Sequence, residues 1–294
     1  MIAKGSGSKV RIGIYEKALP PSSDWHFLLD TARRAGYTFV EMSIDESDGR
    51  LARLEWTARE RAQFHRTVLE EGVPVLSICL SGHRRFPMGS ADPAVRQRGR
   101  DIMARAIDFA LDCGIRTIQL AGYDVYYEPS TPDSRARFRD AMLWTAELAS
   151  SAQVMVAMEI MDYPLMNSIS RWLPYAEMAA TPWFCVYPDV GNLSAWWNDV
   201  PAELKSNIQQ IVAVHLKETL PVGPDFPGKF REVPFGTGCV DFVGIFRALA
   251  EARYKGAFLI EMWNGVSADP IEEIVKARSW MLARMKEGGF TGDE

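Results

Sequence analysis

Four side chains able to bind a metal ion stand within or directly after short apolar segments in the second half of the chain. Glu159 follows VMVAM, Asp189 follows FCVYP, His215 lies within IVAVHLKE, and Glu261 follows AFLI. Singly, such a glutamate more often pairs with arginine and such a histidine is more often a satisfied core residue. As a set, unpaired carboxylates beside apolar residues are costly to desolvate, and a bound cation offsets that cost. The pattern predicts one divalent ion: Mn²⁺, Mg²⁺ or Co²⁺, with Zn²⁺ also accepted by these donors.

Cationic residues that could bind an anionic substrate follow a third apolar segment. LSGHRRFP, residues 80–87, contains His83, Arg84 and Arg85. Arginine forks match phosphate oxygens, so these side chains could bind a phosphate or sugar hydroxyls. The alternative is an ordinary surface loop whose arginines pair with helix carboxylates. Further cationic candidates are Lys217 and Arg231.

Polar and aromatic residues at the ends of the apolar segments are candidates for binding a sugar. Asn192, in GNLSAW, could hydrogen-bond a substrate hydroxyl or shape the turn. Aromatic rings could form a wall stacked on a sugar, or could pack at the mouth of the fold. The aromatic candidates are Tyr15, Trp196, Trp197, Phe235 and Trp263.

The elements that must position these residues alternate along the chain. Apolar, β-branched segments begin at Val10, Phe39, Val75, Thr117, Val154, Phe184, Ile211 and Ala257. Helical patterns lie between them and carry start and stop signals. These helices are expected over 24–36, 57–72 and 92–114, and beginning near residues 130, 168, 201, 241 and 269. Eight strands alternating with eight helices indicate an α/β fold, a single (β/α)8 TIM barrel whose function gathers at the carboxyl ends of the strands.

The alternative architecture is a doubly wound open sheet. No glycine-rich phosphate loop follows the first strand, which disfavours it. The longest irregular segment, residues 219–238, has a length typical of functional or mobile loops.

Composition sets the class of protein. The chain has 294 residues, 47% of them hydrophobic and 24% charged, and a net charge of −5, which argues against a large nucleic-acid-binding face.

We expect a flexible tail over residues 1–9 before a barrel domain over 10–294. No apolar segment approaches the length of a signal or membrane helix, so a cytoplasmic protein without membrane contact is expected. The four scattered cysteines are expected to be reduced core thiols.

Longer motifs carry a specific resemblance that extends from about Val10 to about Lys286. GIYEKALP, CLSGHRRFP, TIQLAGYDVYY, YPDVGNLSAW, VHLKET, FPGKFREVPFGTGCVDF and FLIEMW resemble the L-ribulose-5-phosphate 3-epimerases, members of the xylose-isomerase-like barrels. The resemblance implies a divalent ion on Glu159, Asp189, His215 and Glu261, with Glu159 and Glu261 as the acid/base pair. Related ketose 3-epimerases carry a histidine at the offset of Asn192. Asparagine at this position is typical of the branch of the family that acts on sugar phosphates. The relatives also imply a homodimer or homotetramer.

The implied chemistry suits these residue types. Inverting C3 of a ketose removes a proton next to the C2 carbonyl, and a metal ion can stabilise the resulting enediolate. One carboxylate takes the proton from one face and a second returns one to the other face. Tyr15, His83, Arg84, Arg85, Asn192, Lys217, Arg231 and Trp263 are the residues expected to bind the sugar phosphate.

Other functions use parts of the same pattern. An aldose–ketose isomerase on the same scaffold would move the proton between C1 and C2, and a 3-epimerase could accept a ketose without phosphate. A multi-zinc nuclease of this barrel type would need many histidines, whereas the chain has four. A non-catalytic sugar-phosphate binding protein would need no opposed carboxylates.

Overall fold

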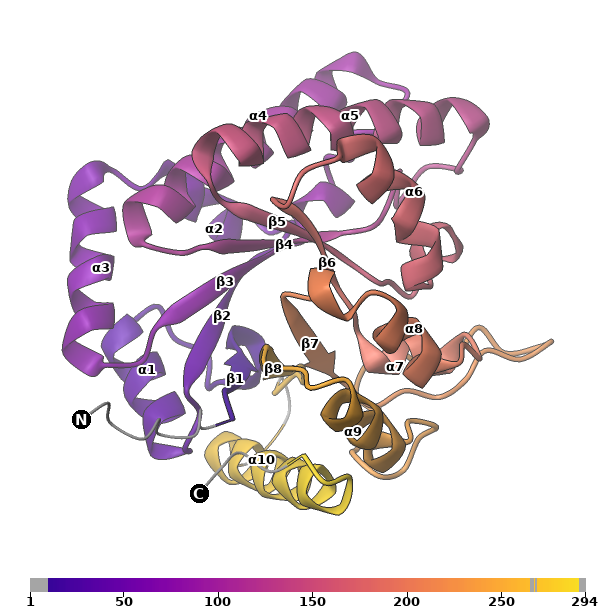
Figure 1. Ribbon diagram of the computed structural model, residues 1–294. Helices are drawn as coiled ribbons and strands as arrows, with labels where there is room; N and C mark the ends of the chain where they lie inside the picture. Colours follow the sequence, from indigo (N-terminus) through magenta and orange to yellow (C-terminus); the bar gives the residue numbers. More distant parts are fainter. Residues whose placement is uncertain (1–9, 265–266, 268, 291–294) are drawn as a thin grey trace, which may run out of the picture.

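Eight parallel strands form the centre of the molecule (Figure 1). The computed structural model describes residues 10–264, 267 and 269–290, so the tail expected over residues 1–9 lies outside the described residues. The sheet order is β6-β5-β4-β3-β2-β1-β8-β7, and isolated parallel bridges Val186–Ile211 and Asp189–His215 join its two ends into a nearly closed barrel. The strands are β1 Ile12–Tyr15, β2 Phe39–Ile44, β3 Val75–Leu80, β4 Thr117–Ala121, β5 Met155–Glu159, β6 Phe184–Tyr187, β7 Ala213–Leu216 and β8 Ala257–Ile260. The predicted barrel is confirmed.

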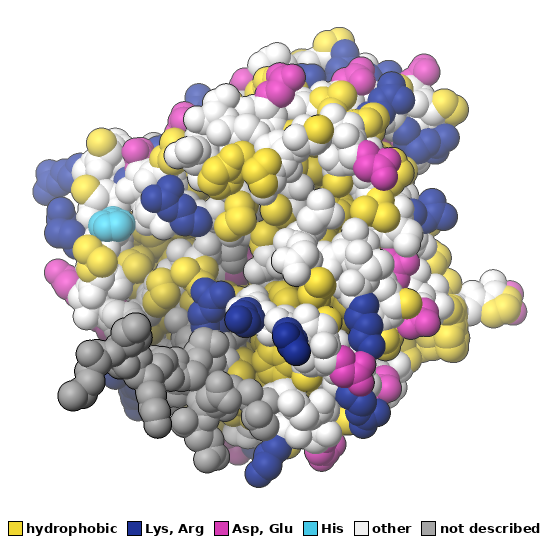
Figure 2. Space-filling view, viewed as in Figure 1, with side chains coloured by type: hydrophobic (Ala, Val, Ile, Leu, Met, Phe, Trp, Pro, Cys, Tyr) yellow, Lys and Arg dark blue, Asp and Glu magenta, His cyan; other side chains and the backbone are white. Residues whose placement is uncertain are grey.

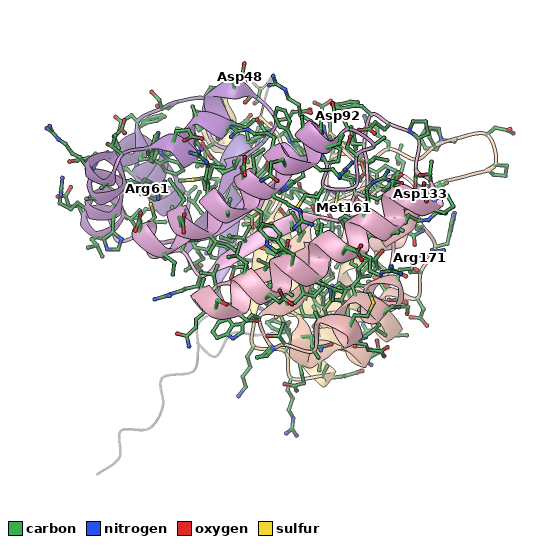
Figure 3. The ribbon with its side chains drawn as sticks, turned by 90° about the horizontal axis from the view of Figure 1, so that it is seen from above. Asp48, Arg61, Asp92, Asp133, Met161 and Arg171 are labelled. Carbon is green, nitrogen blue, oxygen red and sulfur yellow. The ribbon has the colours of Figure 1, made fainter. Side chains whose placement is uncertain are left out.

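Helices surround the strands, and all eight predicted helices are present (Figure 1). They are α1 Trp25–Arg34, α3 Ala58–Glu71, α4 Pro93–Cys113, α5 Pro132–Ala152, α6 Ile169–Ala179, α8 Val200–Ser206, α9 Phe242–Glu251 and α10 Pro270–Glu287. Two short helices, α2 Asp48–Leu51 and α7 Val190–Ala195, were not predicted. Short 3-10 turns cover Glu16–Ala18, Ala52–Glu55, Gly82–Arg84, Pro164–Met166 and Ile208–Gln210. Figure 3 shows α4 and α5 running side by side, with Asp92 and Asp133 at their N-terminal ends.

Helix boundaries follow from local capping. Thr57 and Glu60 form a reciprocal capping box at the start of α3, which satisfies backbone donors that the first turn leaves free. Gly72 ends α3 and Gly114 ends α4 with φ of +67° and +72°, respectively. Glycine reaches this left-handed conformation without a steric penalty, which is why both helices stop there.

The strands are buried on both faces, which explains their continuous apolar character. Outward side chains such as Ile14 and Met42 pack against the helices, whereas inward ones such as Tyr15 and Phe39 fill the barrel. Because side chains alternate along a strand, the residues two or four positions after an inward apolar residue also point inward. The polar inward residues lie mid-strand in β2 to β4 and near or just beyond the carboxyl ends of β5 to β8: Glu41, Ser77, Gln119, Glu159, Asp189, His215, Lys217 and Glu261.

The predicted irregular segment contains a β-hairpin. Leu220 exchanges two backbone hydrogen bonds with Lys229, at 2.8 and 3.1 Å, and Gly223 pairs with Phe226 at its tip. The hairpin projects from the barrel near α7 and α8 (Figure 1). It returns the chain toward the mouth, where residues 231–235 lie beside the end of β8.

The surface and the cysteines agree with the composition. Figure 2 shows Lys and Arg side chains interspersed with Asp, Glu and hydrophobic ones over one face of the molecule. Cys79, Cys113 and Cys185 are buried and Cys239 is half-buried, and all four are free thiols. Within the described part of the chain, no helix is both long enough and apolar enough to cross a bilayer.

Candidate metal and proton-transfer site

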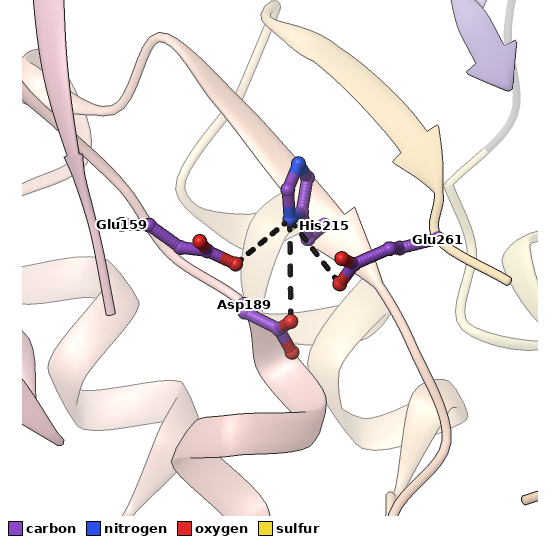
Figure 4. Close-up of side chains that lie close together, drawn as sticks. All are labelled: Glu159, Asp189, His215 and Glu261. Atoms are coloured by element: carbon purple, nitrogen blue, oxygen red, sulfur yellow. Dashed lines mark ion pairs between the residues drawn. The ribbon is translucent and has the colours of Figure 1, made fainter. Parts of the chain in front are cut away.

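The four predicted metal ligands converge inside the mouth of the barrel (Figure 4). Nδ1 of His215 lies 3.3 Å from Oε1 of Glu159, 3.6 Å from Oε2 of Glu261 and 4.0 Å from Oδ2 of Asp189. One ligand atom from each side chain lies within 4.8 Å of all the others, and all four residues are buried. The structure therefore brings together side chains that are up to 102 positions apart in the sequence, from Glu159 to Glu261.

Strand register explains this convergence. Glu159 pairs with Tyr187, two residues before Asp189. Asp189 bridges to His215, and His215 pairs with Leu259, two residues before Glu261. Each ligand is thus an inward residue at a similar height in neighbouring parallel strands, and the closing bridge between the sheet ends places Asp189 beside His215.

Three buried ligand atoms lack a hydrogen-bond partner: Oδ2 of Asp189, Nδ1 of His215 and Oε2 of Glu261. The ammonium of Lys217 lies 2.6 Å from the Asp189 oxygen and 3.1 Å from the Glu261 oxygen, as ion pairs without hydrogen-bond geometry. One ammonium offsets only part of the charge of three buried carboxylates, and buried polar atoms are rarely left unpaired. The cluster is therefore consistent with a bound divalent cation.

Other residues hold three of the ligands in place. Asp189 caps α7, and its Oδ1 accepts a hydrogen bond from the Asn192 backbone N–H at 2.9 Å. The Gln119 amide donates to Oε2 of Glu159. Nε2 of His215 lies 3.2 Å from Oε1 of Glu41. Glu261 makes no comparable hydrogen bond to the described residues and is held by its ion pair with Lys217.

Sequence reasoning missed Glu41 and Gln119. Both lie within apolar strand segments, FVEMSI and TIQLAG, and both are fully buried. A polar residue inside such a segment is itself a signal, because burial without a partner is costly. Neither stands at the end of its segment, where three of the four predicted ligands stand.

The two glutamates differ electrostatically when no ion is bound. Burial raises the pKa of Glu159 above its ordinary range. Burial also acts on Glu261, but the charges of Lys217 and His215 outweigh it and hold the pKa of Glu261 well below that range. Burial raises the pKa of Asp189 to about 7, against the opposing field of Lys217.

Several predicted substrate-binding residues surround the mouth. Tyr15 meets Trp263 edge-on, with ring centroids 6.2 Å apart, and its hydroxyl lies 3.0 Å from that of Ser43. The Arg231 guanidinium lies 5.4 Å from the Trp263 ring centroid, and the Lys217 ammonium lies 6.0 Å from it. Trp263 therefore lies beside two cationic groups, both from the segment that connects β7 to α9.

A cavity of about 560 Å³ opens beside the cluster. Lys217, Glu261 and Trp263 line its inner part, and Phe235 and Trp280 stack together in its outer wall. Its volume falls within the range of small-molecule sites, and its combination of aromatic walls with a few charged groups is typical of them.

The three residues after β3 that were predicted to bind an anion lie in different environments. His83 is buried, its Nε2 lies 2.9 Å from the Gly99 carbonyl oxygen, and burial lowers its pKa to about 4. Arg85 is exposed and pairs with Asp48 at 2.6 Å. The structure thus engages His83 and Arg85 in contacts with the protein itself.

Arg84 packs against two tyrosine rings. Its guanidinium lies 5.6 Å from the ring centroid of Tyr123 and 5.3 Å from that of Tyr126. Its Nε is buried without a hydrogen-bond partner, and it forms no ion pair with the described residues.

Asn192 and the neighbouring tryptophans shape the turn after β6. Asn192 is fully buried and its Nδ2 donates to the Ile160 carbonyl at 2.8 Å, whereas its Oδ1 has no partner. Trp197 is 73% exposed and donates from its indole nitrogen to the Val222 carbonyl, which ties the turn to the hairpin. Trp196 packs near Phe230 of the hairpin base.

Comparison with known proteins agrees with this fold. The family model of the xylose isomerase-like TIM barrel matches residues 29–284. The chain is 57% identical over 280 residues to SgbU of Escherichia coli strain K12, named provisionally as an L-ribulose-5-phosphate 3-epimerase, covering 95% of this chain and 98% of that protein. It is 53% identical over 282 residues to the L-ribulose-5-phosphate 3-epimerase UlaE of Escherichia coli strain SMS-3-5, covering 96% and 97% of the two chains.

Solved structures share the fold at lower identity. A structure of an L-ribulose 3-epimerase superposes with a TM-score of 0.76 at 22% identity, over 95% of this chain and 96% of the other. At that identity the likeness concerns the fold alone. The curated relatives and the family model together show that this chain belongs to the L-ribulose-5-phosphate 3-epimerase family of xylose isomerase-like TIM barrels.

Proposed function

We propose that this chain interconverts L-ribulose 5-phosphate and L-xylulose 5-phosphate by inverting C3, with one divalent metal ion. The observation that carries the proposal is the position of Glu159 and Glu261. They come from β5 and β8, and each places an oxygen within 3.6 Å of the same His215 nitrogen. Two carboxylates that approach one point from different sides of a barrel suit removal and return of a proton at opposite faces of a sugar.

Glu159, Asp189, His215 and Glu261 would hold the ion. Their donor set, three carboxylates and one imidazole, accepts Mn²⁺, Mg²⁺, Co²⁺ or Zn²⁺. When bound, the ion would polarise the ketose carbonyl and stabilise the enediolate. Lys217 places a further positive charge beside Glu261, on the side where the cavity opens.

Proton transfer is assigned to the two glutamates. One takes the C3 proton, and the other returns a proton to the opposite face. Because the reaction runs in both directions, each glutamate serves as acid in one direction and as base in the other. Burial of both side chains excludes water that would otherwise compete for the proton.

We propose that Lys217, Arg231 and Trp263 line the path of the sugar chain and that Tyr15 orients Trp263. Arg84 and Arg231 are the cations proposed for the phosphate, since among the described residues neither forms an ion pair with a carboxylate. His83 and Arg85 are excluded from this proposal because each contacts the protein instead. Asn192 is proposed to act through its unpaired Oδ1 on a substrate hydroxyl. The homodimer or homotetramer and the cytoplasmic location stay predictions.

Proton exchange followed by NMR tests the function. The protein is incubated with L-ribulose 5-phosphate and Mg²⁺ in D₂O, and the signals at C1 and C3 are recorded. We expect deuterium at C3 and the appearance of L-xylulose 5-phosphate. Exchange at C1 with an aldose product would assign an aldose–ketose isomerase instead. If only ketoses without a phosphate exchanged at C3, the substrate would not be a sugar phosphate. Absence of exchange after removal and restoration of the metal would contradict the epimerase itself.

A further inference from the structure

Glu41 is a buried carboxylate that the proposed reaction does not use. It lies in the middle of β2 and is fully buried. Among the described residues, the imidazole of His215 is the one group able to carry a positive charge that lies within 4 Å of it. Burying a carboxylate without an arginine or lysine partner is costly, and an apolar side chain would fill this place in the barrel at lower cost. A role in the fold alone therefore does not explain Glu41.

Both oxygens of Glu41 have defined partners. Oε1 lies 3.2 Å from Nε2 of His215. Oε2 accepts a hydrogen bond of 2.5 Å from the hydroxyl of Ser77, which is the direct cross-strand neighbour of Glu41 in β3. A carboxylate oxygen that faces an imidazole nitrogen accepts a hydrogen bond from it, and this contact favours the hydrogen of His215 on Nε2.

That proton determines what the other ring nitrogen can do. With a hydrogen on Nε2, Nδ1 is the ring nitrogen left to bind an ion; it lies 3.3 Å from Oε1 of Glu159 and has no hydrogen-bond partner among the described residues. A carboxylate behind a metal-binding imidazole fixes its tautomer and ring orientation and makes the ligand nitrogen more basic. Ser77 in turn fixes the carboxylate, because it holds the oxygen that does not face His215.

We propose that Glu41 and Ser77 are positioning residues that prepare His215 as a metal ligand. This inference rests on the proposed metal site and extends it from the four ligands to β2 and β3, which contribute no ligand. It explains why polar side chains also point into the barrel from β2 and β3, although the four ligands come from the other side.

The test compares divalent-ion binding by the metal-stripped protein in matched variants. Glu41→Gln keeps the size and an acceptor oxygen but removes the charge, and Ser77→Ala removes the supporting hydroxyl. The control is Glu16→Gln, since Glu16 is also buried but pairs with the two terminal guanidinium nitrogens of Arg53 at 2.7 Å, away from the ligands. Affinity is measured by calorimetry with Mn²⁺, and ligand geometry by the visible absorption of bound Co²⁺.

We expect Glu41→Gln to weaken Mn²⁺ binding roughly 10- to 100-fold and to shift the Co²⁺ absorption. Ser77→Ala should weaken binding less, and folded Glu16→Gln should bind the ion like the wild type. Unchanged affinity in Glu41→Gln, or an equal loss in Glu16→Gln, would overturn the inference. If Glu41→Gln does not fold, unchanged affinity in Ser77→Ala overturns it. A wild-type chain that binds no divalent ion would instead overturn the proposed metal site.

Discussion

The ammonium nitrogen of Lys217 lies 2.6 Å from Oδ2 of Asp189, inside the cluster of metal-binding side chains. Lys217 follows His215 by two residues, so the same inward side of β7 supplies first a ligand and then a cation. The ammonium also lies 3.1 Å from Glu261. In the protein without metal, Lys217 therefore compensates carboxylates whose charge a divalent ion would otherwise balance.

This relationship predicts that Lys217→Met destabilises the metal-free protein more than the metal-bound protein. Removing one partner of a buried ion pair costs roughly 3–5 kcal/mol, because a buried charge is left uncompensated. A bound ion would take over the compensation, so the loss should shrink when Mn²⁺ is in excess. Thermal unfolding with EDTA and with Mn²⁺ measures both values.

Lys205→Met is the matched control. Lys205 pairs with Glu251 at 2.6 Å on the surface, where such pairs contribute roughly 0–1 kcal/mol. Its small effect should be the same with and without the ion. An equal loss of stability for Lys217→Met under both conditions would contradict the compensating role.

Much of the fold was predictable because the signals are local. The apolar segments that became β1 to β8 are buried on both faces, and the capping box of Thr57 and Glu60 lies at the start of the helix predicted over 57–72. The short helix α7 was missed because Asp189 reads as the end of a strand, although its side chain also caps the following turn. One aspartate therefore has two functions, and the sequence pattern indicates only one of them.

The site was predictable as far as it depends on strand ends. Parallel strands bring their carboxyl ends to one rim, so Glu159 and Glu261 could be placed together from their positions in the sequence. The contact between Glu41 and His215 was not predictable in this way, because it crosses the barrel interior between β2 and β7, which β1 and β8 separate in the sheet. The same holds for His83 and Arg85, whose partners Gly99 and Asp48 belong to other segments of the chain.

Exchanging either glutamate for glutamine should strongly reduce epimerisation while the fold survives. Glutamine retains a ligand oxygen but cannot transfer the proton, and a positioned acid or base contributes roughly 10²–10⁴-fold to the rate. We expect kcat to fall by that order in Glu159→Gln and Glu261→Gln, with Mn²⁺ still bound at saturating concentration. Coupled product assays and metal analysis of the same samples measure the two quantities.

The surface variant Glu251→Gln, which removes an exposed carboxylate on α9, should keep wild-type turnover. Near-normal turnover in Glu159→Gln or Glu261→Gln would remove that residue from proton transfer.

Adjacent arginines offer a matched test of phosphate recognition. Arg84→Met should raise KM for a phosphorylated ketose, because its guanidinium has no carboxylate partner among the described residues and lies against Tyr123 and Tyr126. A hydrogen bond to a charged group contributes roughly 1.5–3 kcal/mol, which corresponds to about a 10- to 150-fold change in KM. Arg85→Met should leave KM unchanged, because Arg85 is exposed and paired with Asp48.

Steady-state kinetics with the ketose phosphate and with the free ketose separate the contributions, since a phosphate contact affects only the first. Arg231→Met belongs in the same series. If neither Arg84→Met nor Arg231→Met changes KM for the phosphorylated substrate, the phosphate lies elsewhere.

The buried His83 should make the protein less stable as the pH falls from about 6.5 to about 4. Burial lowers its pKa from 6.5 to about 4, so the unfolded chain binds a proton more readily than the folded one. Its contribution is thus complete above pH 6.5 and is lost below it, amounting to about 2 kcal/mol at pH 5. His83→Gln does not titrate and should lose less stability over this range. Urea unfolding of both proteins at pH 7.5 and pH 5 gives the difference.

His26→Gln provides a control of opposite sign. The hydrogen bond with Glu71 raises the pKa of His26, so its stabilising contribution is present at low pH and is lost as the pH rises. Removing it should therefore steepen the acid loss of stability, whereas removing His83 should flatten it. Parallel pH profiles for the wild type and His83→Gln would show that His83 is protonated as readily in the folded protein as in the unfolded chain, contrary to its burial against the Gly99 carbonyl.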